Sequence, residues 1–540
     1  MTRSRLALSA SFLPLLALLA GPGPARAASY TMNVDTTNDT LDINPGDGVC
    51  EDAEGYCSIR AAVMELNALG QGTINVPSGT YRLARTGTHE DAGLTGDLDI
   101  SAEIHIVGTA GTSGPATVIQ AVGDRALDIT ESGLDHQVSV SSVEFIDGDA
   151  GGFEGGAIRA RVSGLTVVDC VFDGNQAHEG GAIDFDGVFL QTGGGLFEGN
   201  VADDGGAIVA RGEFISYGTT YSGNEATGTN GRGGAVYIPS GWFQMIHTTM
   251  DNNIASLGGA LHVVADPGLT LAHGASTMQL GSFIGNYATS GGAAWLEGTH
   301  RIEMEDMLFM SNEAPDGRGG GIHADAQLEI WRTAFVDNRS GTRGGALSWD
   351  GAYTGAELHV VSSTFAENET GQFGGAMAVN GGDVYVSNST IAHNQATARA
   401  AHGGGIYHEG ATDFRMTHTI VAHNAASTGL YMAFAGNDIS TVATRVQSTG
   451  YNIVADAPVS AFMPSTGDFY GTPSSSPFIP LGTLGYHGYS TLTYDMGPAF
   501  ITLDGGDVAC TTPDGIAITR DQRGNPRPVG AACDIGAVER

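Results

Sequence analysis

The chain has 540 residues, of which 82 are glycine and only 18 are proline, and its formal net charge is −36 at pH 7. Glycine is about twice as frequent as in an average protein, and a hydrophobic share of 41% is too high for a disordered chain. Every basic side chain is arginine, and the excess of acidic groups excludes nucleic acid and anionic membrane surfaces as partners. Cations and neutral glycans stay compatible with this charge.

The first residues are typical of a secretory signal peptide. Arg3 and Arg5 precede an apolar run from Leu6 to Ala20, and the Ala-Arg-Ala sequence at 25–27 is a small-residue cleavage site. A membrane anchor is the alternative, but the apolar run is short for a helix that crosses a bilayer. The sequence therefore predicts that residues 1–27 are a signal peptide, that the protein is exported, and that the mature chain has no transmembrane segment.

Oxygen-bearing side chains are concentrated just after the predicted cleavage site. They are Asp35, Asn38, Asp39, Asp42, Asn44, Asp47, Glu51 and Asp52. Such groups are the ligands that Ca²⁺ prefers. Their spacing matches no EF-hand loop, so a solvated polar turn is the favoured interpretation and Ca²⁺ is the alternative. The sequence predicts no other metal or cofactor.

A short helix is predicted next, as part of an N-terminal cap with the first coils over residues 28–100. Ser58 is a suitable N-cap, and Ile59, Val63 and Leu66 share one face of the helix. Such a helix would cover the open end of a solenoid and protect its exposed strand edge. A first strand and turn are then expected at 73–81.

Five cysteines are present, and four of them form two pairs that are close in sequence. Cys50 with Cys57 and Cys510 with Cys533 would form two local disulfides, as in many exported proteins. Cys170 is left over. In other repeats small residues dominate the equivalent position, so we expect a buried and unreactive thiol there.

A repeated unit dominates the chain from about residue 145 to residue 425. Each copy begins with two glycines, a small residue and an apolar residue, and ends with an apolar residue, two variable positions and Asn. The glycine pairs start at Gly155, Gly180, Gly205, Gly233, Gly258, Gly291, Gly319, Gly344, Gly374 and Gly403. Successive glycine pairs therefore start 25 to 33 residues apart. A period in this range indicates a repeat architecture, and apolar residues alternate within each copy as they do in strands.

One such unit cannot bury its apolar face alone, whereas stacked units can. The sequence therefore predicts an all-β chain, with parallel β-helix repeats over 101–425. The asparagines are expected at turns, where Asn tolerates left-handed geometry and its amide can bond the neighbouring coil. The repeat fades after residue 425, which predicts irregular terminal coils and a C-terminal cap over 426–540.

Strand alternation separates inward from outward positions. The residue after each Gly-Gly-small triplet is apolar and inward, so the next residue and the one two positions further point outward. Because stacked coils lie ~4.8 Å apart, one outward patch would combine Trp295, Glu297, His323, Asp325 and Asp350. Aromatic rings stack on sugars and carboxylates bond hydroxyl groups, so the patch predicts glycan binding. Its last four residues are the candidates for glycosidase-type acid–base catalysis.

Further candidates lie in the same outward columns. Aromatic and imidazole groups are Tyr237, His262 and Tyr407, beside Trp295. A second patch combines charges that could bind an acidic glycan, and its members are Arg159, Arg161, Asp184, Asp186 and Arg211. The alternative for both patches is a solvated sheet face without a ligand, because polar side chains also pair across strands.

Two terminal motifs carry a resemblance. Residues 44–50 and 57–63, Asn-Pro-Gly-Asp-Gly-Val-Cys and Cys-Ser-Ile-Arg-Ala-Ala-Val, resemble the N-terminal CSLREA-type domain of bacterial exported proteins, which usually has Leu at Ile59 and Glu at Ala61. Residues 521–528 and 533–539, Asp-Gln-Arg-Gly-Asn-Pro-Arg-Pro and Cys-Asp-Ile-Gly-Ala-Val-Glu, resemble the closing segment of choice-of-anchor β-helix proteins. The repeats are similar to those of chlamydial polymorphic outer-membrane proteins. The resemblance implies a right-handed parallel β-helix outside the bacterial cell or at its surface, and it implies no activity.

These observations favour an extracellular or surface interaction protein whose partners are polysaccharides, cell-surface glycans or cell-surface proteins. A polysaccharide lyase or glycoside hydrolase that uses the outward patch is the first alternative. A purely structural spacer is the second. Near the C-terminus, Arg520, Arg523 and Arg527 are expected to stabilise the cap by hydrogen bonds and not to form an anion site.

Overall fold

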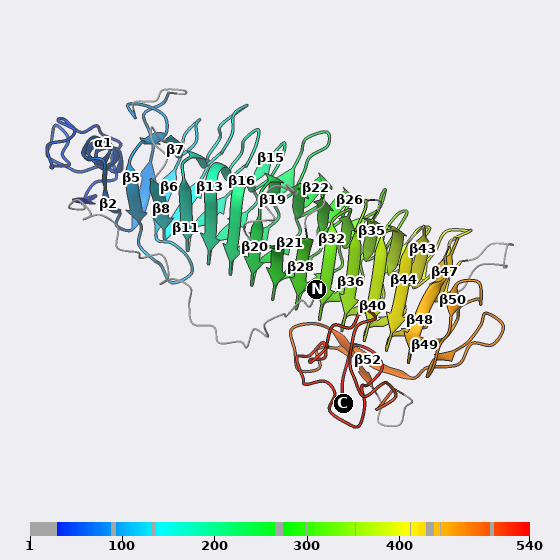
Figure 1. Cartoon of the computed structure of the whole chain (residues 1–540). Helices are drawn as coiled ribbons and strands as arrows, with labels where there is room; N and C mark the ends of the chain where they lie inside the picture. Colours follow the sequence, from blue (N-terminus) through cyan, green and yellow to red (C-terminus); the bar gives the residue numbers. More distant parts are fainter. Residues whose placement is uncertain are drawn as a thin grey trace.

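The computed structural model shows an elongated solenoid of parallel strands (Figure 1). It describes residues 30–87, 93–130, 136–264, 274–298, 301–351, 353–410, 412–427, 437–442, 444–496 and 502–540. The predicted signal peptide lies outside the described residues. The predicted all-β, parallel β-helix fold is confirmed. No helix in the described part of the chain is long and apolar enough to span a membrane.

Three parallel sheets run along the solenoid. Among the described residues they contain 27, 15 and nine strands, and we call them the major, second and third sheets. One coil contributes β13 (Ile183–Gly193) to the major sheet, β14 (Leu196–Glu198) to the second and β15 (Val201–Ala202) to the third. Ile183 pairs with Ile208 of the next coil. Residues 25 positions apart are therefore vertical neighbours, as the repeat predicts.

The N-terminal end of the solenoid is covered by α1 (Ile59–Leu69). The Ser58 hydroxyl accepts a hydrogen bond from the Ala61 amide at 3.0 Å, and Cys50 is bonded to Cys57. Both predictions are confirmed. One difference is that β1 (Tyr30–Asn33) pairs in parallel with β2 (Gln71–Asn75), so the first strand precedes the helix. With only Met32 buried, β1 is too short for its alternation to be recognised.

Buried asparagines form a continuous hydrogen-bonded ladder along the core. Each side-chain amide donates to Oδ1 of the next asparagine at 2.8 to 3.0 Å. The members are Asn175, Asn200, Asn224, Asn253, Asn286, Asn312, Asn338, Asn368, Asn394 and Asn424. Asp438 accepts the last of these bonds at 2.9 Å and ends the ladder. From Asn175 to Asp438 the ladder satisfies buried polar groups in each coil, which holds neighbouring coils in register.

The sequence analysis predicted that the asparagine of each turn is left-handed. The structure shows instead that the residue before the asparagine has the left-handed conformation. Gly199 has φ 62°, and the equivalent residues Asn252, Glu367 and His393 have φ 55°, 60° and 60°. The physical reason is that the ladder amide must point into the core to reach the adjacent coils. The left-handed position can then hold glycine or a polar side chain that faces solvent.

Aromatic rings stack beside this ladder. Phe145, Phe172, Phe197 and Tyr221 follow one another with centroid distances of 4.6 to 5.0 Å. Cys170 lies in the same core and is buried. Burial raises the pKa of its thiol to about 12, which fits the predicted unreactive thiol.

The C-terminal segment packs against the side of the solenoid (Figure 1). It begins with an antiparallel hairpin of β52 (Leu481–Gly485) and β53 (Thr493–Met496). The Cys510–Cys533 disulfide is present, as predicted, and contacts Val361 of the major sheet. Apolar residues on the flank of coils more than a hundred positions earlier are thus covered by chain that carries no repeat.

The closing motif attaches this segment by side-chain hydrogen bonds. The Thr364 hydroxyl donates to the Gln522 side-chain oxygen at 2.5 Å, and the Ala537 amide donates to the Thr390 hydroxyl at 3.1 Å. The buried Arg527 guanidinium pairs with Glu539 at 2.9 Å. These contacts agree with the stabilising role predicted for the terminal arginines.

Acid is expected to loosen this attachment through His418. The buried His418 ring accepts a hydrogen bond from the Asp507 amide at 2.9 Å, and burial, with Arg527 nearby, lowers its pKa to about 4. An unfolded histidine has a pKa of about 6.5, so the unfolded state binds the extra proton between these values. The stability that neutral His418 contributes is complete above pH ~6.5 and is lost towards pH ~4, by about 3 kcal/mol.

We expect His418→Gln, which keeps an acceptor but does not titrate, to lose less stability on acidification than the wild type. The measurement is the free energy of unfolding between pH 4 and pH 8 for both proteins. Parallel curves for the two proteins would contradict this assignment. Other buried histidines contribute equally to both curves and cancel in the difference.

Candidate functional site

Four rings form a column on the outer side of the major sheet, which we call the ring ladder. They are Tyr237 in β19 (Val236–Ser240), His262 in β23 (Leu261–Val264), Trp295 in β27 (Ala294–Glu297) and His323 in β31 (Ile322–Ala324). Successive members pair across adjacent coils. Their ring centroids lie 5.3, 6.0 and 4.5 Å apart. The structure therefore brings these predicted residues together.

The ring ladder points outward but is largely buried. Tyr237, His262 and His323 are only 4%, 2% and 6% exposed, and Trp295 is half-buried. Arg232, which precedes a glycine pair, contributes to this cover, because its guanidinium lies 4.3 Å from the centroid of the Tyr237 ring. Imidazoles from the coils on either side contact the Trp295 ring. Only Trp295 of the four rings keeps part of its surface exposed for a sugar, and the neighbouring carboxylates of Glu297 and Asp325 are accessible as well.

Glu297 is held beside the ring ladder. The His262 Nε2 atom lies 3.6 Å from the Glu297 carboxylate, a long contact for a hydrogen bond. This interaction and the neighbouring Trp295 side chain lower the pKa of Glu297 below its usual value. Glu297 is half-buried and anionic at neutral pH.

Asp325 follows Glu297 in the next coil and has the opposite shift. Its side chain is exposed and accepts a hydrogen bond from the Gly298 amide at 2.9 Å. Partial desolvation, and then repulsion from Glu297 and Asp350, raise the pKa of Asp325 above its usual value. Two neighbouring carboxyl groups with opposite pKa shifts are the arrangement in which one carboxyl serves as acid and the other as base.

The other two catalytic candidates are less available. Asp350 has partners within the protein, and His323 is buried. The Asp350 carboxylate pairs with Arg318 at 2.7 Å and accepts a hydrogen bond from Asn380 at 3.2 Å. Burial lowers the pKa of His323 to about 4, so its ring is neutral at pH 7. We define Glu297, Asp325 and Asp350 as the carboxylate patch.

Tyr407 belongs to a separate ring pair. Ser348 and Ala378 occupy the same column between His323 and Tyr407, so the ring ladder does not reach it. The Tyr407 ring stacks on Phe373 at a centroid distance of 4.6 Å. The sequence analysis did not select Phe373, because it lies just before a glycine pair, outside the strand alternation.

The second predicted patch is a ladder of ion pairs. The wholly buried Asp184 carboxylate lies between the guanidinium groups of Arg161 and Arg211, and Arg159 pairs with Asp128 at 2.7 Å. Each arginine therefore already has a carboxylate partner, and only Asp186 is exposed. Binding of an acidic glycan here would have to compete with these pairs.

The acidic stretch after the predicted signal peptide uses its carboxylates within the protein. Asp39 pairs with the buried Arg60 at 2.6 Å, and Asp52 accepts a hydrogen bond from the Tyr56 amide at 3.0 Å. Asp35 accepts one from the Cys57 amide at 2.8 Å. Within the described ranges, no group of three or more His, Cys, Asp or Glu residues is placed to hold a metal ion.

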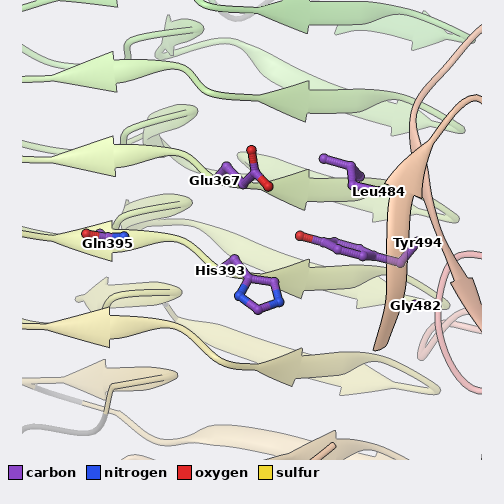
Figure 2. Close-up of a pocket in the computed structure, with 6 residues that line it drawn as sticks. All are labelled: Glu367, His393, Gln395, Gly482, Leu484 and Tyr494. Carbon is purple, nitrogen blue, oxygen red and sulfur yellow. The ribbon is translucent and has the colours of Figure 1, made fainter. Parts of the chain in front are cut away.

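Figure 2 shows a pocket that the sequence analysis missed, with a volume of about 520 Å³. It lies between the solenoid and the C-terminal hairpin. The lining residues are Glu367, His393, Gln395, Gly482, Leu484 and Tyr494. The two walls are far apart in sequence, so no spacing predicts it. The one available signal is that Glu367 and His393 occupy turn positions where earlier coils have glycine.

Comparison with known proteins gives only distant structural similarities. No family model matches the chain, and no curated protein matches it. A solved structure described as "a new PL6 alginate lyase complex with trisaccharide" has 13% sequence identity and a TM-score of 0.41, covering 88% of this chain and 93% of that chain. Another, "Geobacillus virus E2 - ORF18", has 11% identity and a TM-score of 0.20, covering 86% and 63%. Likeness at this level carries no inference about activity.

Proposed function

We propose that this protein is an exported bacterial β-helix protein that binds polysaccharide through the carboxylate patch on its major sheet. The observation that carries the proposal is the placement of Glu297 and Asp325 in adjacent coils: Glu297 ends β27, Asp325 directly follows β31, these two strands are paired, and both carboxylates remain accessible. Stacked coils are ~4.8 Å apart, so the two carboxylates are close enough to contact hydroxyl groups of one sugar residue or of two adjoining residues. Carboxylates accept hydrogen bonds from such hydroxyls.

The charge of the chain restricts the glycan. A net charge of −36 opposes an acidic polymer unless cations bridge it to the protein. The proposed ligand is therefore a neutral polysaccharide or cell-surface glycan. Two disulfides and the CSLREA and choice-of-anchor resemblances support a location outside the cell.

The test is a glycan array with the purified protein, followed by affinity measurements on the best glycan. Hydrogen bonds to charged groups contribute about 1.5–3 kcal/mol, so Asp325→Asn and Glu297→Gln are each expected to weaken binding about 10-fold or more. Asp186→Asn is the matched control, because Asp186 is an exposed carboxylate in the same outward column several coils away. Equal affinity in all variants would refute the assigned patch, and no binding to any glycan would favour a structural spacer.

A glycoside hydrolase is the second candidate, and the opposite pKa shifts of Glu297 and Asp325 favour it. In that reaction Asp325 would donate a proton to the leaving oxygen, and ionised Glu297 would act as base or nucleophile. We expect Asp325→Asn to lower the rate of reducing-end release from a bound polysaccharide by at least ~100-fold. Release that persists in Asp325→Asn would exclude this mechanism, and release by no variant would leave binding as the function.

A further inference from the structure

The pocket of about 520 Å³ between the solenoid and the C-terminal hairpin has the size of a small-molecule site. Its solenoid wall comes from the turns that follow β37 (Thr364–Ala366) and β41 (Thr390–Ala392) and from the start of β42 (Gln395–Ala396). Its other wall comes from β52 and β53. The pocket is therefore built from turns that lie on a different side of each coil from the carboxylate patch.

A buried hydroxyl without a partner marks this pocket. Tyr494 is only 4% exposed, and its hydroxyl oxygen has no hydrogen-bond partner among the described residues. In Figure 2 the Tyr494 side chain extends from β53 into the space between Glu367 and His393, with its oxygen foremost. An unsatisfied buried hydroxyl is costly. A ligand that exchanges a hydrogen bond with Tyr494 would remove this cost.

The remaining lining groups offer both donors and acceptors. Glu367 contributes a carboxylate and Gln395 an amide. Partial burial, and then the neighbouring His423, lower the pKa of His393, so its ring is neutral at pH 7 with one donor and one acceptor nitrogen. The Leu484 side chain adds an apolar wall.

We propose that this pocket binds one neutral sugar residue through its hydroxyl groups. Four hydrogen-bonding side chains around a cavity of this size match a small ring that carries several hydroxyl groups, as a sugar does. An anion has no cationic partner, because the lining includes no arginine. A metal ion would find only one carboxylate and one imidazole there.

The ring of Tyr494 is anchored so that its hydroxyl is presented at a fixed position. It packs with Leu308, Val336 and Ala366 on the flank of the solenoid. The ligand would therefore contact the solenoid and the C-terminal segment at once. A bound sugar is expected to strengthen the attachment of that segment, because it binds only the attached form.

The experiment is saturation-transfer NMR of the full-length mature protein with glucose, galactose and mannose as probes. At least one sugar is expected to bind, and Tyr494→Phe, which removes only the hydroxyl, is expected to reduce its affinity at least 5-fold. Glu367→Gln is expected to lower the affinity of the protein for the same sugar. Tyr217→Phe is the matched control, because Tyr217 is 56% exposed on the solenoid surface.

Folding and binding are separated by the melting temperature without sugar. Since Tyr494→Phe removes an orphaned hydroxyl, it should melt at the same temperature as the wild type or higher. A monosaccharide whose binding is lost in Asp325→Asn but kept in Tyr494→Phe binds at the carboxylate patch, and that result would overturn the assignment to this pocket. The proposal is overturned if none of the three sugars binds, or if Tyr494→Phe binds as the wild type does.

Discussion

Gly319→Ala is expected to lower the stability of the solenoid by about 3 kcal/mol or more, whereas Gly199→Ala should cost only about 1 kcal/mol. The two glycines have the same left-handed backbone, with φ 61° and 62°. They differ in what an added Cβ would meet. At Gly319 it would lie 2.1 Å from the Ile322 carbonyl oxygen, while at Gly199 nothing lies within 4 Å.

This pair of variants separates backbone strain from a steric clash. Both alanines carry the left-handed penalty of about 1–2 kcal/mol, which is partly offset by the lower entropy of the unfolded chain. Only Gly319→Ala must also displace the strand that follows the glycine pair. The measurement is the urea midpoint and m-value of each variant. Similar midpoints would show that the glycine pair serves conformation alone.

Asn253→Asp is expected to destabilise the protein by about 3–5 kcal/mol, and Asn252→Asp by less than about 1 kcal/mol. Asn253 is wholly buried, and its amide donates to the Tyr221 carbonyl and to the Asn286 side chain, both at 3.0 Å. Aspartate keeps the acceptor oxygen but loses both donors, and it places a charge inside the core.

Asn252, the residue before Asn253, is a closely matched control position. It is exposed and left-handed, and the equivalent position of a later coil is Asp337, with φ 53°. The same chemical change is therefore made at consecutive residues, one in the ladder and one outside it. Thermal melts at pH 7 would test the difference. If both variants melt like the wild type, the ladder does not contribute to stability as we describe.

These two effects explain how the carboxylate patch is positioned. The first glycine of each pair leaves room for the strand that follows it, and the second allows the next coil to approach closely. The asparagine ladder prevents one coil from slipping against the next. Glu297 and Asp325, 28 positions apart in sequence, become neighbours only because both devices hold the register. A register slip of one residue would turn both carboxylates to the opposite face of the sheet.

The sequence by itself determined the repeating part of this protein. The spacing of Ile183 and Ile208 predicted their pairing, and the asparagine column predicted contacts between coils. Both disulfide pairs followed from short separations. These features are readable because a solenoid converts a fixed spacing in sequence into a vertical contact, so that one local pattern is confirmed many times along the chain.

Only the tertiary structure decided what the outward residues can do. Three of the four rings in the ring ladder are buried although their positions point outward, and Asp184 is buried between arginines. The pocket at Tyr494 arises where a non-repeating segment packs against coils that lie 87 to 127 positions earlier in the chain. Such lateral contacts depend on the fit of two surfaces and leave no period in the sequence, which is why the spacing of residues could not reveal them.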